Sequence, residues 1–161
     1  MEALKLVDAY LHTSPIPKDE KPEGVEVRLE MDLGSKGLPN LIGVIDLVRA
    51  GGMIVDFKTT SQTPDREKVI QLTETQMTCY ALLYKDATGK KERGFELHHL
   101  VKIKKPKLVV ATLSPTTDQQ KVRLFRRIES YVEGVSREDF VPSPGLQCSS
   151  CEFFKECRKW S

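Results

Sequence analysis

The sequence contains no apolar run close to the roughly 18 residues that a membrane span needs. Its first residues include acidic side chains and have no apolar core followed by a small-residue cleavage site, so we expect no secretory signal. The formal net charge is only +2. A basic surface for a partner would therefore have to be a local patch, and composition alone does not indicate nucleic acid. We expect a cytoplasmic protein with no membrane partner.

Cysteine is scarce and unevenly placed. The chain has four cysteines, none before Cys79 and three within the last fourteen residues. This distribution argues against a disulfide scaffold and favours metal ligands or inert thiols. A length of 161 residues suits one domain with a real core. We expect a single domain over 1–161, with a core over 25–134 and a cysteine-rich tail over 140–161.

The apolar pattern predicts an alternation of helices and strands. Helical spacing is present over residues 2–11, 65–85 and 118–133, with Leu4, Val7 and Leu11 on one side of the first helix. Strand patterns cover residues 25–33, 41–48, 53–60, 95–104 and 107–114, and residues 49–52 have the composition of a hairpin turn. This order predicts an α/β domain with a mixed sheet of about five strands flanked by helices.

Two acidic positions on neighbouring strands suggest a site. Alternation places Asp56 and Lys58 on the same face of the strand 53–60. If the turn centres near Gly51, Asp46 falls opposite Asp56, within one residue of register. Directly opposed carboxylates have Cβ atoms about 5 Å apart and repel each other, and a divalent cation would offset that repulsion. The alternative is that Asp46 only ends a strand and that Asp56 and Lys58 form a surface ion pair.

Three motifs resemble one nuclease family. The segments GVID (43–46) and IVDFKT (54–59) resemble the G-x-x-D and (V/I)-D-(Y/F)-K-T motifs of RecB-like nucleases, a branch of the PD-(D/E)XK superfamily. The segment QMTCY (76–80) is similar to their Q-x-x-x-Y motif, in which both side chains share one helix face. The branch includes CRISPR-associated adaptation exonucleases and AddB-type nuclease domains. The resemblance implies a restriction-endonuclease-like core.

The resemblance also implies roles for the motif residues. Asp46 and Asp56 would bind Mg²⁺ or Mn²⁺, with the Phe57 carbonyl as a further ligand and Lys58 as a catalytic residue. The remaining residues that the resemblance adds to the site are Gln76, Tyr80 and Glu26. Glu26 matches an acid often seen on the strand before G-x-x-D, and its alternative is a solvated strand face.

The implied activity is metal-dependent cleavage of DNA. Phosphodiester hydrolysis by metal-activated water is the expected chemistry, and relatives act as exonucleases on single strands or duplex ends. The alternative is a catalytically degenerate or truncated nuclease fold that binds DNA within a helicase–nuclease or CRISPR adaptation complex, beside a helicase or integrase partner. An unrelated metal-dependent hydrolase is a third possibility, but it leaves the 76–80 motif and the cysteine tail without a role.

The cysteine tail carries a second resemblance. Residues 140–142 and 148–157 are similar to the proline-containing segment and C-x-x-C-x(5)-C that end many RecB-like nucleases, which implies a [4Fe–4S] cluster. The implied ligands are Cys148, Cys151 and Cys157. The family's upstream cysteine and metal-binding histidine have no match, since Cys79 is expected to be a packing residue and His12 precedes a proline-rich loop. We therefore expect a C-terminal part of a longer protein, or a shortened relative without the family's N-terminal helices. Zinc or free thiols are alternatives to the cluster.

Lysines and histidines near the fourth strand are less specific. A basic run at Lys102, Lys104, Lys105 and Lys107 would suit a DNA backbone, or is a solvated turn. His98 and His99 are expected to point to opposite faces of the strand, as ordinary strand histidines rather than a metal pair.

Overall fold

The computed structural model describes residues 2–13, 15–139 and 145–159. These residues form two compact units, Met1–Arg126 and Arg127–Ser161, which are considered separately below. Among the described residues, no helix is both long enough and apolar enough to span a bilayer.

The first unit is built on a five-stranded sheet in the order β1-β2-β3-β4-β5. The strands are β1 (Gly24–Met31), β2 (Leu41–Arg49), β3 (Met53–Thr60), β4 (Gly94–Val101) and β5 (Lys107–Leu113). All neighbours pair antiparallel except β3 and β4, which are parallel. A parallel pair needs a long crossover, and α2 (Arg66–Thr88) provides it. The α/β fold with a mixed sheet is thus confirmed.

The other helical segments are short, apart from α3. They are α1 (Glu2–Thr13), η1 (Gly34–Lys36), α3 (Asp118–Ser136), η2 (Leu146–Ser150) and α4 (Phe154–Cys157). In α2 the Asp65 side chain accepts the Glu67 and Lys68 amides at the N-terminus, and Gly89 ends the helix in a left-handed conformation. Both are standard helix boundaries.

The core lies between the sheet and α2. Ile45, Ile54 and Leu97 of the sheet are fully buried against residues of α2 such as Leu83. Gly43 allows this approach, because a Cβ there would lie 2.7 Å from Leu83 Cδ1. A larger residue at Gly43 would require the Leu83 side chain to shift.

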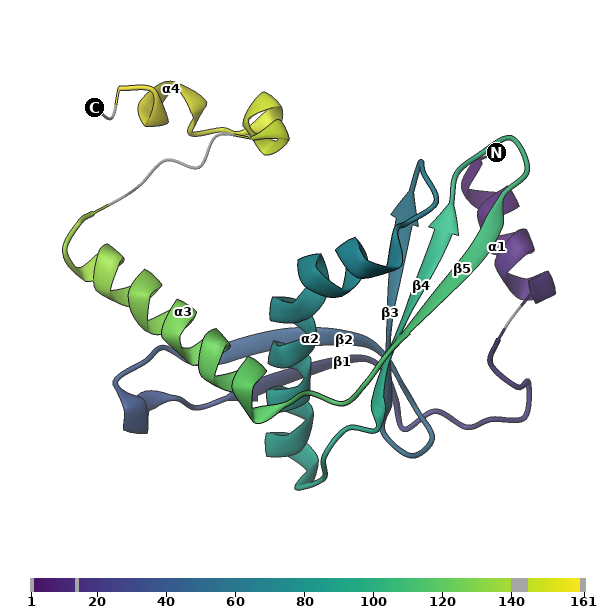
Figure 1. Ribbon diagram of the computed structural model, residues 1–161, viewed down its shortest axis with the longest axis horizontal. Coiled ribbons are helices and arrows are strands. Elements are labelled where there is room, and N and C mark those ends of the chain that lie inside the picture. Colours follow the sequence, from purple (N-terminus) through teal and green to yellow (C-terminus); the bar gives the residue numbers. More distant parts are fainter. Residues whose placement is uncertain (1, 14, 140–144, 160–161) are drawn as a thin grey trace. The chain divides into compact units, whose positions relative to one another are not determined.

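The sheet divides into two arms at the middle of β2. The β2–β3 pairs run only from Arg49↔Met53 to Leu47↔Val55. Beyond them β2 continues with β1, whereas β3 continues with β4 and β5, and Figure 1 shows the two arms running in different directions. Asp46 is the first residue of β2 past the shared ladder, so its side chain sits where the arms separate.

The apolar side of α1 differs from the expected arrangement. Leu4, Val7 and Leu11 do share one side, but they are 73%, 50% and 65% exposed, while Leu6 is buried. Tyr10 follows Leu6 by one helical turn and contacts the sheet at His98. The periodicity identified a helix, but the contact with the sheet selects a different face of it.

Candidate active site

Asp56 is the most buried charged group of the predicted motif. It lies on β3 and is 2% exposed. Its Oδ1 accepts hydrogen bonds from Lys58 Nζ at 3.1 Å and from Gln76 Nε2 at 3.0 Å. Its Oδ2 lies 2.8 Å from Lys58 Nζ as an ion pair, but the angle is not that of a hydrogen bond, so this buried oxygen has no hydrogen-bond partner. A buried carboxylate oxygen in this state is suited to accept a cation or a further donor.

Gln76 and Tyr80 complete a hydrogen-bonded chain from the helix. Lys58 Nζ donates to Gln76 Oε1 at 3.1 Å, and Gln76 Nε2 also donates to the Tyr80 hydroxyl at 2.9 Å. The two residues are one turn apart on α2, which places both on the side of the helix that faces the sheet. The amide of Gln76 therefore fixes both Lys58 and Asp56, while Tyr80 fixes Gln76.

The Asp46 side chain lies in the same region and accepts a hydrogen bond from the backbone of β3. The Phe57 N–H donates to Asp46 Oδ2 at 2.8 Å. Continuing the β2–β3 register by one residue places Asp46 opposite Asp56. The carboxylate thereby substitutes for a backbone acceptor at the point where the ladder ends, and the two aspartates flank the Phe57 peptide.

The electrostatics of the site reflect burial and like charge. Burial raises the pKa of Asp56 above its usual value, and the Asp46 charge raises it further, while Lys58 opposes both effects. Burial also raises the pKa of the Tyr80 hydroxyl. Positive charge placed between the two aspartates would stabilise the ionised form of Asp56 against the cost of its burial.

Glu26 is distinguished by its backbone conformation, and its exposed side chain does not point to a role as a ligand. Its φ of 48° is left-handed, and the β1–β2 pairs run from Val25↔Leu47 to Val27↔Ile45 without it. The same register would place it opposite Asp46. Its side chain is exposed. A left-handed non-glycine residue costs of order 1 kcal/mol and often occurs at functional sites, so Glu26 marks a distortion beside Asp46.

His99 is a member of this region that the sequence interpretation missed. It pairs with Lys58 across the parallel β3–β4 ladder, whereas His98 points to the other face toward Tyr10. His99 is 6% exposed and its Nε2 is buried without a hydrogen-bond partner. Burial lowers its pKa, and the charge of Asp56 acts in the opposite direction. Only the β3–β4 register, which alternation within one strand does not provide, reveals this neighbour.

The predicted metal ligands fit a sparse, oxygen-rich site. Asp46 and Asp56 provide two carboxylates, and Mg²⁺ is commonly held by one or two carboxylates plus waters and substrate phosphates. Within residues 2–13, 15–139 and 145–159, no three His, Cys, Asp or Glu side chains are grouped closely enough to hold a metal ion by themselves. The two aspartates with the Phe57 carbonyl therefore fit a cation that shares its coordination with substrate.

The cysteines do not form a comparable group. Cys148, Cys151 and Cys157 lie in the second unit as free thiols, and they are not among any ligand group of the described residues. The Gly145 N–H donates to Cys148 Sγ at 3.3 Å. Residues 140–142 of the proline-containing segment lie outside the described residues. In this arrangement the three thiols do not fit a closed cluster site.

The predicted basic segment lies near the C-terminal end of β3. Lys102, Lys104 and Lys105 are exposed in the β4–β5 turn. The Lys102 N–H donates to the Thr60 carbonyl at 2.7 Å. Because Thr60 is two residues past Lys58, this turn begins at the same end of β3 as the candidate site.

Comparison with known proteins places this arrangement in context. A family model described as the PD-(D/E)XK nuclease superfamily matches residues 2–158. No curated protein matches the sequence. Among solved structures, a protein of Eubacterium rectale to which exonuclease activity is attributed has a TM-score of 0.56 and 16% identity, covering 83% of this chain and 51% of its own. The protein SSO0001 has a TM-score of 0.53 and 17% identity, covering 94% and 64%. The chain thus spans less than two thirds of either neighbour, and at these identities the likeness shows the fold alone.

Proposed function

This chain belongs to the PD-(D/E)XK nuclease superfamily, and we propose that it is a Mg²⁺- or Mn²⁺-dependent nuclease that hydrolyses phosphodiester bonds of DNA. The observation that carries the proposal is the buried Asp56, hydrogen-bonded to both Lys58 and Gln76, with Asp46 beside it at the end of the β2–β3 ladder. A structural ion pair would not need a second carboxylate at that point, because like charges there are destabilising.

Each residue has a distinct task in this proposal. Asp46 and Asp56, with the Phe57 carbonyl, would hold the divalent cation. When bound, such an ion neutralises charge on the phosphate and lowers the pKa of a water molecule. Lys58 provides an ammonium group beside the buried carboxylate, where it can donate to a phosphate oxygen or orient the attacking water. Lys58 is held in place by Gln76 Oε1 at 3.1 Å.

The finer assignments rest on the motifs. Membership of the RecB-like branch is proposed because Gln76 bonds to both Asp56 and Lys58 of the D-x-K strand and also donates to the Tyr80 hydroxyl. Exonuclease action on single strands or duplex ends is the proposed specificity, and DNA is the proposed substrate. Lys102, Lys104 and Lys105 are proposed to contact the phosphate backbone, since they are exposed at the same strand end as the site.

The alternative is a nuclease fold without activity that binds DNA beside a helicase or integrase partner. The complete set of Asp46, Asp56, Lys58 and Gln76 favours catalysis over this alternative. A [4Fe–4S] cluster on the three tail cysteines stays a prediction from the resemblance. Visible absorbance after anaerobic reconstitution with iron and sulfide tests the cluster separately from the nuclease.

The first test is digestion of end-labelled single- and double-stranded DNA with Mn²⁺, Mg²⁺ or EDTA. We expect metal-dependent cleavage that Lys58→Ala abolishes, because no other ammonium contacts Asp56 among the described residues. Lys90→Ala is the matched control, since this exposed lysine precedes β4 at the other end of the β3–β4 ladder. DNA binding without cleavage by the wild-type protein would favour the inactive module instead.

A further inference from the structure

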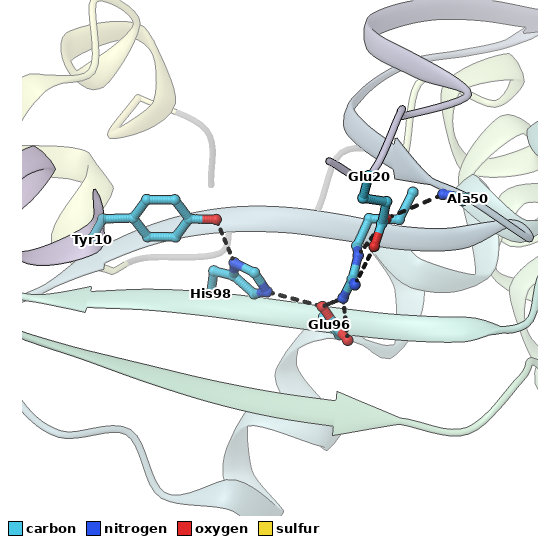
Figure 2. Close-up of polar contacts among 6 residues, drawn as sticks. Tyr10, Glu20, Ala50, Glu96 and His98 are labelled. Atoms are coloured by element: carbon cyan, nitrogen blue, oxygen red, sulfur yellow. Dashed lines mark hydrogen bonds and ion pairs between the residues drawn. The ribbon is translucent and has the colours of Figure 1, made fainter. Parts of the chain in front are cut away.

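The face of the sheet opposite the candidate site carries a second polar assembly, which we call the reverse-face network. It consists of Tyr10, Glu20, Arg49, Glu96 and His98 (Figure 2). The network is nearly dry: the side chains of Arg49, Glu20 and Glu96 are 16%, 15% and 15% exposed, and His98 is fully buried. The proposed catalytic residues do not include any of its members.

Arg49 ties two strands together across a third. It lies at the end of β2 and pairs with Met53 of β3. Its Nη1 donates to both carboxylate oxygens of Glu96 on β4, at 3.0 and 2.9 Å. Its Nε and Nη2 donate to Glu20 at 2.9 and 2.7 Å. A guanidinium with hydrogen bonds to carboxylates on two sides has a fixed orientation. Arg49 therefore links β2 to β4 across the face of β3 that is opposite the candidate site.

This link matters because the β2–β3 ladder is short. Only three residue pairs are formed between these strands before they diverge at Asp46. The position of Asp46 relative to Asp56 therefore depends on few ladder bonds and on what else restrains β2. The Arg49–Glu96 contact is such a restraint, three residues from Asp46 along the strand.

Phe57 connects the network to the site. Its ring makes edge-to-face contacts with Tyr10 and His98 on the reverse face, with centroids 5.6 and 5.5 Å apart. Its backbone N–H donates to Asp46 on the other side of the chain. Tyr10 and His98 are themselves joined by a 3.1 Å hydrogen bond, and His98 Nε2 lies 3.1 Å from Glu96. Any shift of this network moves the peptide that separates Asp56 from Lys58.

We infer that the reverse-face network is a positioning device that sets the separation of the Asp46 and Asp56 carboxylates, with Arg49 and Glu96 as its positioning residues. The inference rests on the proposed function, since it concerns the cation that those carboxylates would hold. It assigns a role in metal affinity to residues that touch neither metal nor DNA. Partners that orient a metal ligand from outside typically change metal affinity by about 10- to 100-fold when removed.

The test is calorimetric titration of the folded protein with Mn²⁺ in the absence of DNA. We expect Glu96→Gln, which keeps the shape of the side chain and weakens its pairing with Arg49, to raise the Kd for Mn²⁺ about 10-fold. The matched control is Glu92→Gln, because Glu92 is also buried but accepts the Thr116 N–H outside the network. Both variants should lose stability, but only Glu96→Gln should lose Mn²⁺ affinity.

If Glu96→Gln fails to fold, the same titration with Mn²⁺ can be made on the variant Arg49→Lys. It keeps the charge and loses the two-sided contact, so the Kd for Mn²⁺ should again rise. Equal Mn²⁺ affinity in the wild type and in a folded network variant would overturn the inference and leave the nuclease proposal standing. No Mn²⁺ binding by the wild type itself would instead overturn the proposed metal site, and the inference with it.

Discussion

Replacing Asp56 with asparagine is expected to stabilise the metal-free protein while it abolishes cleavage. Burial and the neighbouring Asp46 raise the pKa of Asp56, so the folded chain holds this proton more tightly than the unfolded chain. Stability from such a group is present below the unfolded pKa and is lost as the pH rises through the folded pKa. At neutral pH the ionised carboxylate therefore costs stability. Asparagine has nearly the same shape and removes that cost.

The size of the effect follows from burial and from the two neighbouring charges. Carboxylates about 5 Å apart repel by about 3 kcal/mol at an effective dielectric constant of about 20. Lys58 Nζ, at 2.8 Å from Oδ2, offsets this repulsion, so the cost that remains is mainly that of burying the carboxylate. We therefore expect a net gain of about 1 kcal/mol for Asp56→Asn, within the usual range for relief of a functional site. For a protein of this size that is about 3 °C in Tm.

A divalent cation should reverse the order of stability. A ligand at about 100 times its Kd stabilises the native state by about 2.7 kcal/mol, or roughly 8 °C in Tm. Because Asp56→Asn removes a proposed ligand, its Tm should rise little when Mn²⁺ is added. The assay is thermal unfolding by circular dichroism in EDTA and in excess MnCl₂. Asp86→Asn, at an exposed position on α2, is the control and should not differ from the wild type. An asparagine variant that is less stable in EDTA, or that gains as much from Mn²⁺ as the wild type, would refute the reasoning.

Three further variants test other parts of the site. Gln76→Leu removes the amide that holds the lysine and the buried aspartate, and single-turnover kinetics should show a rate about 10²-fold lower with the fold retained. Replacing Lys102, Lys104 and Lys105 with alanine should lower the slope of log Kd against log salt for single-stranded DNA by about 2, measured by fluorescence anisotropy. Glu26→Gly relieves the left-handed φ of 48° and should raise the free energy of unfolding in urea by about 1 kcal/mol. Weaker Mn²⁺ binding in the same variant would identify Glu26 as a ligand.

The parts of the site that were predictable are those that depend on local pattern. Alternation within one strand places Asp56 and Lys58 together, and the structure joins them by an ion pair. A turn at residues 49–52 is enough to bring Asp46 to the level of Asp56. The helix after β3 begins at Arg66, directly after the capping residue Asp65. Each of these steps needs information from no more than about twenty residues.

The parts that were not predictable depend on contacts between distant segments. His99 reaches the site only because β3 and β4 are parallel and in a register that pairs it with Lys58. Tyr10 contacts Phe57 and His98 because α1 packs on the sheet through the side of Leu6 and Tyr10, and its stripe of Leu4, Val7 and Leu11 stays exposed. In a short helix with apolar residues on several sides, burial against the sheet decides which side is inward, and the spacing does not.

Phe57 illustrates why a motif identifies a site without explaining it. In the pattern D-(Y/F)-K the middle position reads as an apolar strand residue, and its ring does face away from Asp56 and Lys58. Yet its N–H holds the second aspartate, and its ring is held by residues from α1 and β4. Under the proposed positioning role, the Phe57 ring is the contact through which Tyr10 and His98 would act on the spacing of Asp46 and Asp56.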